Sequence, residues 1–126
     1  MKWRKILIMS VISILFLLLY KVIDWYSYNQ IFNRSAWIDG DEGFGYPQRK
    51  YMLNDLIEHH KIKGLTYKQL VNNMGYARID SGSYEAYYNV ILDYGWDIDP
   101  VYSKDLVIQL NRDSVVTGFE IKEWKH

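Results

Sequence analysis

The stretch TYKQLVNNMG at residues 66–75 carries start and stop signals for a short helix. Thr66 and Gln69 have the spacing of a capping box, in which each side chain bonds to the other residue's backbone N–H. Gly75 closes the stretch as a left-handed stop. The apolar residues fall on one side of such a helix: Leu70, Val71 and Met74. The sequence therefore predicts a helix over residues 67–74.

A longer amphipathic segment precedes this helix. Pro47 suits a first turn, and the apolar residues that follow predict a helix over about residues 48–60: Met52, Leu53, Leu56 and Ile57. Residues 39–47 are rich in glycine and predict a loop. Residues 24–38 form a connector whose aromatic residues keep helical spacing, so we expect the preceding helix to run on into it.

After Gly75 the apolar pattern changes to a period of two. Three strands are predicted, over residues 83–92, 106–110 and 115–121, and the turn residues 111–114 join the last two as a hairpin. The short connections favour antiparallel pairing, with both helices on one face of the sheet. On the first strand the inward face is expected to carry Tyr84, Ala86, Tyr88, Val90 and Leu92. We therefore expect an α+β domain over residues 48–126, with the element order ααβββ.

The N-terminal segment has the composition of a membrane-spanning helix. Basic residues at positions 2, 4 and 5 precede residues 6–20, in which only two serines are polar. We interpret residues 1–23 as an uncleaved signal anchor, followed by a connector and loop over residues 24–47. The residues expected at the membrane interfaces are Trp3, Lys5, Lys21, Trp25 and Tyr26. A cleaved secretory signal is the alternative, although residues 21–28 lack the small residues of a cleavage site.

The charge distribution predicts the orientation of this anchor. Residues 1–23 carry four basic residues and no acidic one, whereas residues 24–126 carry 11 basic and 15 acidic residues. The positive-inside rule places the basic N-terminus in the cytoplasm. We therefore expect a single-pass protein that contacts membrane lipid through its helix and holds its C-terminal domain outside the cytoplasm.

Composition and motif spacing exclude several classes of function. The absence of cysteine excludes disulfide frameworks, cysteine zinc sites and thiol catalysis. A formal net charge of zero provides no basic field for nucleic acid. Asp39 and Asp41 begin a loop that lacks calcium-loop spacing, and the adjacent His59 and His60 point in different directions on a helix, with no evident carboxylate to orient them. We expect no enzymatic activity, no metal and no cofactor.

Aromatic residues are unusually frequent, at 17% of the chain, and they gather on the first strand and the loop after it. One interpretation is that a small core uses large side chains to bury more area. The other is a protein-binding surface, because aromatic side chains with a polar tip suit protein interfaces. The residues of this candidate surface are Tyr87, Tyr94, Trp96 and Tyr102.

The order of these motifs resembles the SmpA/OmlA family of small bacterial envelope lipoproteins, related in fold to β-lactamase inhibitory protein modules. The resemblance covers about residues 49–121. It rests on the cap and stop of the 67–74 helix, a strand with a tyrosine-rich face, the Asp99-Pro100 turn and the strand Leu106-x-Ile108-x-Leu110. It implies two helices on a three-stranded antiparallel sheet and a non-enzymatic role in binding partner proteins, in that family as an accessory of outer-membrane β-barrel assembly.

The chain departs from the family in two places. It lacks the cysteine that carries the lipid in those lipoproteins, so its anchor would be the N-terminal helix and its membrane the inner one. The usual Gly-x-Pro after the second helix is Gly75-Tyr76-Ala77. Two functions follow as expectations. The first is a membrane-anchored extracytoplasmic protein-binding module that serves as an accessory in envelope or membrane-protein assembly. The alternative is an inhibitor- or immunity-like protein that blocks a specific enzyme through its sheet face.

Overall fold

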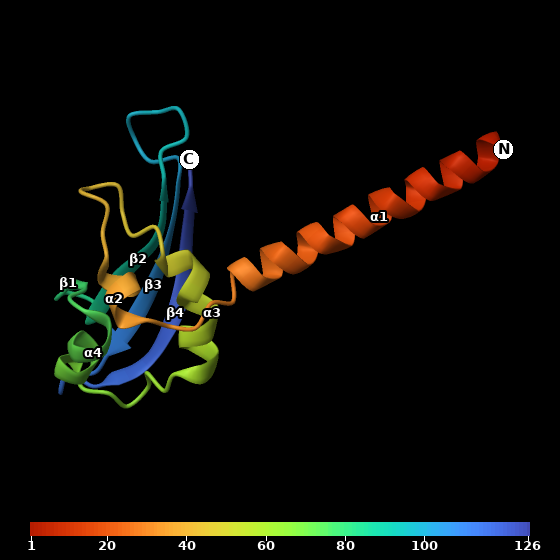
Figure 1. Ribbon diagram of the computed structural model, residues 1–126. Coiled ribbons are helices and arrows are strands. Elements are labelled where there is room, and N and C mark those ends of the chain that lie inside the picture. Colours follow the sequence, from red (N-terminus) through yellow and green to blue (C-terminus); the bar gives the residue numbers. More distant parts are fainter.

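The computed structural model describes residues 1–126 and shows an α+β domain from which one long helix projects (Figure 1). The sheet is antiparallel throughout, with strand order β1-β2-β3-β4. The elements are α1 (Lys2–Ser27), α2 (Arg34–Ile38), α3 (Arg49–His59), α4 (Tyr67–Met74), β1 (Arg78–Asp80), β2 (Glu85–Asp93), β3 (Tyr102–Leu110) and β4 (Val116–Lys125).

The predicted capping box starts α4 as expected. The Thr66 hydroxyl accepts the backbone N–H of Gln69 at 3.2 Å, and the Gln69 side chain accepts the backbone N–H of Thr66 at 2.9 Å. The helix ends at Met74, and Gly75 follows with a φ of +79°. The Tyr88 hydroxyl donates to the Gly75 carbonyl at 2.8 Å, which ties this helix end to the middle of the sheet.

The predicted element order was incomplete by one strand and one helix. β1 has only three residues, too few to show a period-two pattern, and pairs with the start of β2, where Arg78 lies opposite Tyr87. α2 has five residues and begins where the Asn33 side chain accepts the backbone N–H of Ala36. Both elements are shorter than the windows over which apolar periodicity can be recognised.

The predicted inward face of β2 is correct only in its middle. Ala86, Tyr88 and Val90 are buried against the helices. Tyr84 lies before the strand with a φ of +55° and is half exposed. A register shift between Asn89 and Ile91 sets Leu92 opposite Ser103, so Leu92 leaves the inward face.

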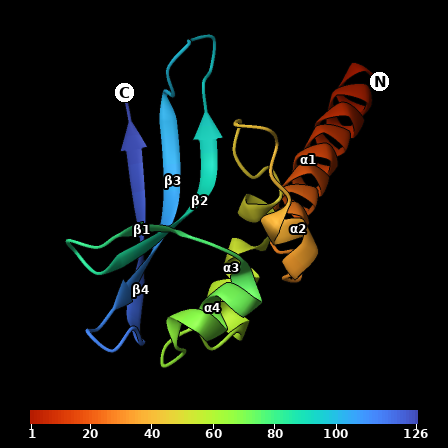
Figure 2. The ribbon, with the colours of Figure 1, turned by 90° about the vertical axis from the view of Figure 1, so that its left-hand side faces the viewer.

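The core lies between the inward face of the sheet and helices α2, α3 and α4 (Figure 2). Trp37, the buried residue of α2, is completely enclosed and packs its ring against those of Tyr88 and Phe32. The other buried members of the core are Met52, Leu53, Leu56, Ile62, Leu70, Met74, Ala86, Val90, Leu106, Ile108 and Val116. The short helix that the sequence pattern did not reveal therefore supplies the largest side chain of the core.

The hairpin between β3 and β4 forms at the predicted turn. The Asn111 side chain accepts the backbone N–H groups of Asp113 and Val115, each at 3.0 Å. β4 pairs with β3 along its length and forms one edge of the sheet. Only the start of its outer edge is covered, where Val116 exchanges backbone hydrogen bonds with Gly64 and Leu65.

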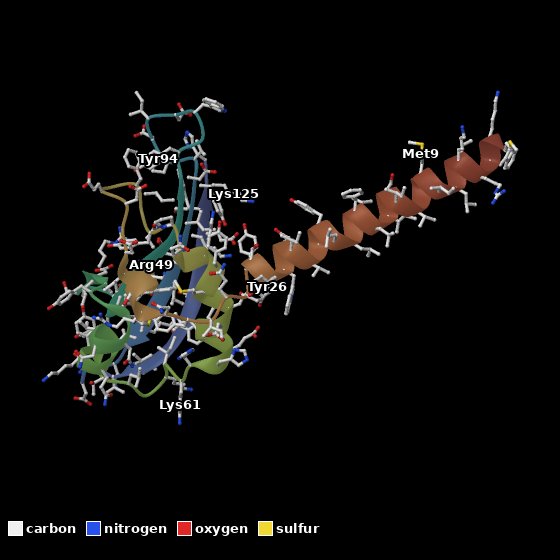
Figure 3. All side chains as sticks on the ribbon, viewed as in Figure 1. Met9, Tyr26, Arg49, Lys61, Tyr94 and Lys125 are labelled. Carbon is white, nitrogen blue, oxygen red and sulfur yellow. The ribbon has the colours of Figure 1, made fainter.

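Helix α1 is long and apolar enough to span a membrane, and none of its residues is buried in the protein. Its side chains project into open space on all sides, Met9 among them (Figure 3). Its serine hydroxyls are satisfied within the helix, since Ser10 donates to the Leu7 carbonyl and Ser13 to the Met9 carbonyl.

The connector after α1 is bound along α3. Helix α1 runs on into the connector, as the aromatic spacing predicted, but only to Ser27, and residues 28–33 leave the helix. The backbone N–H of Gln30 donates to the Tyr51 carbonyl at 2.9 Å, and the backbone N–H of Phe32 donates to the Asp55 carboxylate at 2.7 Å. Ring contact between Tyr28 and Tyr51 adds a third attachment. Residues 28–33 are thus a strap on the domain surface.

Asp55 is the central attachment point of this strap. Besides accepting from Phe32, its carboxylate contacts the His59 ring at 2.8 Å and the His60 ring at 3.2 Å. The expectation that no carboxylate orients these histidines was wrong, because Asp55 lies one helical turn before His59. The Phe32 N–H, followed by the two histidines, holds the pKa of Asp55 below its ordinary value, and burial opposes this effect only in part.

The lowered pKa predicts a pH-dependent loss of stability. An aspartate whose folded pKa lies below the unfolded value of about 3.9 stabilises the fold fully above that pH and loses the contribution as the pH falls further. In Asp55→Asn, we expect a lower free energy of unfolding at pH 7, and a difference from wild type that shrinks between about pH 5 and pH 2. Urea unfolding monitored by tryptophan fluorescence would measure it.

Asp113→Asn, on the exposed β3–β4 turn, serves as the control for this measurement. It should stay close to wild type at every pH. A difference between Asp55→Asn and wild type that does not change with pH would contradict the role assigned to the Asp55 carboxylate.

Candidate functional site

Two loops lie side by side at one end of the domain and expose its most prominent apolar side chains (Figure 1). They are residues 39–47, before α3, and residues 93–101, between β2 and β3, and together we call them the apical surface. Trp96 and Ile98 are almost fully exposed, and Phe44 is two-thirds exposed. The Phe44 and Tyr94 rings meet edge to face at 6.0 Å, which joins the two loops.

Local hydrogen bonds shape each apical loop. The backbone N–H of Asp41 donates to the Gly45 carbonyl at 2.9 Å, across a turn in which Gly43 and Gly45 have positive φ. In the second loop, the Asp93 side chain accepts the Gly95 N–H at 2.8 Å, and its carbonyl accepts the Val101 N–H at 2.8 Å. The exposed aromatic residues are therefore presented on turns with defined geometry.

The apical surface is strongly acidic. Its two loops contain six acidic residues and no basic one: Asp39, Asp41, Glu42, Asp93, Asp97 and Asp99. Carboxylates of one sign gathered around exposed apolar side chains create a negative potential that attracts cationic groups. Arrangements of this kind favour a partner with both apolar and basic side chains.

The four predicted binding residues do not form one surface. Tyr94 and Trp96 lie on the apical surface (Figure 3). Tyr102 lies at the start of β3, partly buried, with the Lys125 amine 5.7 Å from its ring centre. Burial, and then the nearby Glu123, raise the pKa of Tyr102. Tyr87 lies on the outer face of the sheet, which is the face turned away from the helices.

Tyr87 belongs to a charged cluster on that outer face. Its hydroxyl donates to Glu85, and the Lys122 amine bonds to Glu85 at 3.3 Å. The Arg78 guanidinium lies 4.8 Å from the Tyr87 ring centre. The Tyr87 hydrogen bond, and then Lys122, keep the pKa of Glu85 below its usual range, while the bond to Glu85 raises the pKa of Tyr87. Tyr87 lies opposite Val107 of β3, which is completely buried although it does not belong to the main core.

A cleft of about 730 Å³ runs between this outer face and the first apical loop. Carboxylates come from both sides, Asp41 and Glu42 from the loop and Asp105 from β3. Asn89 donates to Asp105 at 3.0 Å, while its own side-chain oxygen is buried without a hydrogen-bond partner. Half of the residues that line the cleft are charged or polar, and they do not bring together a nucleophile, a base and an oxyanion donor.

The first apical loop is held from below by a buried arginine. Arg49 is only 3% exposed, and its guanidinium lies 3.4 Å from the Tyr46 ring centre and 5.0 Å from that of Trp37. It donates to the Trp37 carbonyl at 2.8 Å and to the Asn89 carbonyl at 2.9 Å, without a carboxylate partner. Burial lowers the pKa of Arg49 from its usual value to about 10, with Tyr46 and Tyr88 opposing this effect, so the group stays charged at neutral pH.

The predicted membrane-interface residues lie at the two ends of α1. Trp3 and Lys5 occupy its first turns, and Lys21, Trp25 and Tyr26 its last two. All five are exposed, and Tyr26 marks the point where the helix meets the domain (Figure 3). At about 1.5 Å per residue, the two tryptophans are roughly 33 Å apart, close to the thickness of a hydrocarbon core.

Comparisons of the chain with protein-family models, characterised proteins and solved structures found no match. The residues that sequence reasoning missed are Phe44, Ile98 and Arg49. Phe44 and Ile98 stand in loops rich in glycine and aspartate, where an apolar residue has no local structural reason to be present, and that contrast could have identified them. Arg49 had no such signal, because arginine is mostly exposed in proteins.

Proposed function

We propose that this protein is a membrane-anchored, non-enzymatic binding module whose apical surface docks a partner protein. The observation that carries the proposal is the nearly complete exposure of Trp96 and Ile98 beside Phe44, within two loops that contain six acidic residues and no basic one. Trp is among the residues most enriched at interface hot spots, and an exposed cluster of this kind marks interaction sites.

In this proposal α1 spans the inner membrane once, with the basic N-terminus in the cytoplasm and the domain in the periplasm. The positive-inside rule and the aromatic residues near both helix ends support this orientation. The partner would present basic side chains around an apolar pocket. A role as an accessory in envelope assembly agrees with the motif resemblance to SmpA/OmlA lipoproteins, and remains part of the proposal.

A photocrosslinking experiment in cells tests the docking site. With a photoreactive residue in place of Ile98, we expect a discrete crosslinked adduct, whose yield falls at least about thirtyfold when Trp96→Ala is added, as for a hot-spot tryptophan. The same photoreactive residue in place of Ile79, a half-exposed isoleucine on β1, is the control and should give no such adduct.

The outcomes separate the two candidate functions. Equal adducts from positions 98 and 79, or an adduct that does not respond to Trp96→Ala, would contradict docking at the apical surface. An inhibitor- or immunity-like protein would instead use the outer face, where Arg78, Glu85 and Lys122 hold the Tyr87 ring in place. An adduct from a photoreactive residue at position 87 that Trp96→Ala leaves unchanged would favour that alternative.

A further inference from the structure

The outer edge of β4 is an unpaired strand edge with defined hydrogen-bonding positions. The backbone N–H of His126 bonds to the Val101 carbonyl, and the β3–β4 register is regular from Tyr102 to Gln109. In an antiparallel ladder, residues alternate between bonding to the neighbouring strand and pointing away from it. The amides of Phe119, Ile121, Glu123 and Lys125 therefore point to the open edge.

The side chains of this strand alternate between the two faces of the sheet. Phe119 and Ile121 pack toward the core, and Glu123 follows them on the same face, where it pairs with Lys104. Glu120 and Lys122 lie on the outer face with Trp124, which is 50% exposed. Open strand edges tend to pair with further strands, and natural proteins protect them with charges, bulges or covering segments. Here the covering segment reaches only Val116.

We propose that β4 pairs with β4 of a second copy of this chain, antiparallel and with the twofold axis at Ile121, to form a continuous eight-stranded sheet. In this register Glu120 stands opposite the partner's Lys122, and the same pair repeats by symmetry. Ile121 stands opposite the partner's Ile121. Trp124 stands opposite the partner's Gly118, which has no side chain of its own and lies beside the flexible end of Gln109.

The charges on β4 distinguish this register from its neighbours. A twofold axis at Glu120 or Glu123 would set two glutamates directly opposite each other, and an axis at Lys122 would do the same with two lysines. A register cannot form the ladder if it places a residue whose N–H points to the open edge opposite a residue whose N–H points to β3. Like charges directly opposite each other destabilise a strand pair, whereas opposite charges stabilise it. Among axes at residues 120–123, only Ile121 gives complementary pairs.

The same symmetry is compatible with a shared membrane. The twofold axis of an antiparallel edge pair runs perpendicular to the sheet. In Figure 1 the strands run up the page and α1 runs mostly across it, while in Figure 2 α1 lies on the same side of the sheet as helices α2, α3 and α4. Because α1 leaves the domain on the helix-covered side of the sheet, rotation about that axis brings both anchors out on that side.

Charge reversal in the full chain, held in detergent micelles, tests this interface. Wild type is expected to be a dimer by light scattering during size-exclusion chromatography. Lys122→Glu and Glu120→Lys should each weaken the dimer about tenfold or more, because two symmetric pairs become repulsive. The double variant E120K/K122E should restore the dimer. Lys122 also bonds to Glu85 within the chain, and the double variant leaves that bond broken, so recovery isolates the contact between copies.

Cysteine crosslinking gives an independent measurement, since the chain has no cysteine of its own. Ile121→Cys should form a dimer with a short bismaleimide, and Ile79→Cys, on the opposite edge strand β1, should not. A monomeric wild type, a double variant no more dimeric than the single ones, or equal crosslinking at positions 121 and 79 would each overturn the proposal. Equal crosslinking at positions 121 and 79 would indicate that the copies associate through α1 and not through β4.

Discussion

Replacing Arg49 with methionine is expected to lower the free energy of unfolding by about 3 kcal/mol. Methionine has a similar length but cannot donate hydrogen bonds, so the carbonyls of Trp37 and Asn89 lose their bonds from the guanidinium. Each unpaired buried carbonyl costs roughly 1–3 kcal/mol. The stacking of the cation on Tyr46 and Trp37 is lost as well.

One effect opposes this loss. Burying a cation without a carboxylate partner costs free energy, as the lowered pKa of Arg49 shows, and methionine removes that cost. We expect the lost hydrogen bonds to dominate, because Arg49 bonds to two separate segments, the end of α2 and the edge of β2. Arg49→Lys keeps the charge but not the planar fork, and should lose about 1–2 kcal/mol.

Urea unfolding of the full chain in detergent micelles would measure these values, with tryptophan fluorescence as the signal, to which the enclosed Trp37 contributes the change on unfolding. Arg112→Met, at an exposed position of the β3–β4 turn, is the matched control and should change stability by less than about 0.5 kcal/mol. If Arg49→Met were as stable as wild type, the free-energy cost of burying the guanidinium would equal the stability that its hydrogen bonds and ring contacts contribute. The variant should also weaken docking at the apical surface, because Tyr46 loses its support.

Gly75→Ala is expected to destabilise the domain by a similar amount, about 3 kcal/mol. Gly75 has a φ of +79° and a ψ of −176°, a backbone region that is essentially restricted to glycine. A Cβ atom would lie only 2.7 Å from the Cγ2 atom of Ile38, at the end of α2. The substitution therefore combines backbone strain with a steric clash between α4 and α2.

Two further variants separate these contributions. Gly64→Ala introduces a side chain at a φ of +92° with no atom within 4 Å, so it should show backbone strain alone, about 1–2 kcal/mol. In the Ile38→Ala background, Gly75→Ala should lose less stability than in wild type, because the clashing methyl group is gone. Equal losses in the two backgrounds, measured by urea unfolding, would show that strain alone accounts for the effect.

The parts of the fold that were predicted from sequence are those that local interactions determine. The Thr66–Gln69 cap and the Asn111 turn each bond within a few residues, so their spacing alone identified α4 and the final hairpin. The position of Leu92 was missed because it depends on a register shift against β3, a contact between distant parts of the chain. β1 and α2 were missed because each is defined mainly by what it packs against.

For the candidate site too, local sequence features could be predicted, and features that depend on distant contacts could not. Composition pointed to the loop after β2 as a place where aromatic residues gather, and the structure places Tyr94 and Trp96 in that loop. Composition could not show that Tyr87 lies on a different surface from Tyr94 and Trp96, because the two faces of a strand differ only in which parts of the protein cover them. Burial of Arg49 depends on three rings from α2, the first apical loop and β2, which only the folded chain brings together.

In the proposed membrane-anchored arrangement, the strap of residues 28–33 along α3 would make bilayer thickness relevant to binding. A membrane-spanning helix adapts to a thinner or thicker bilayer by changing its tilt. If a flexible linker joined α1 to the domain, a change in the tilt of the helix would not reorient the domain. Because the strap is hydrogen-bonded to Tyr51 and Asp55, a change in the tilt of a membrane-inserted α1 would turn the domain as well and move the apical loops. In the proposed arrangement, the height and direction in which the exposed tryptophan is presented would therefore depend on the surrounding lipid.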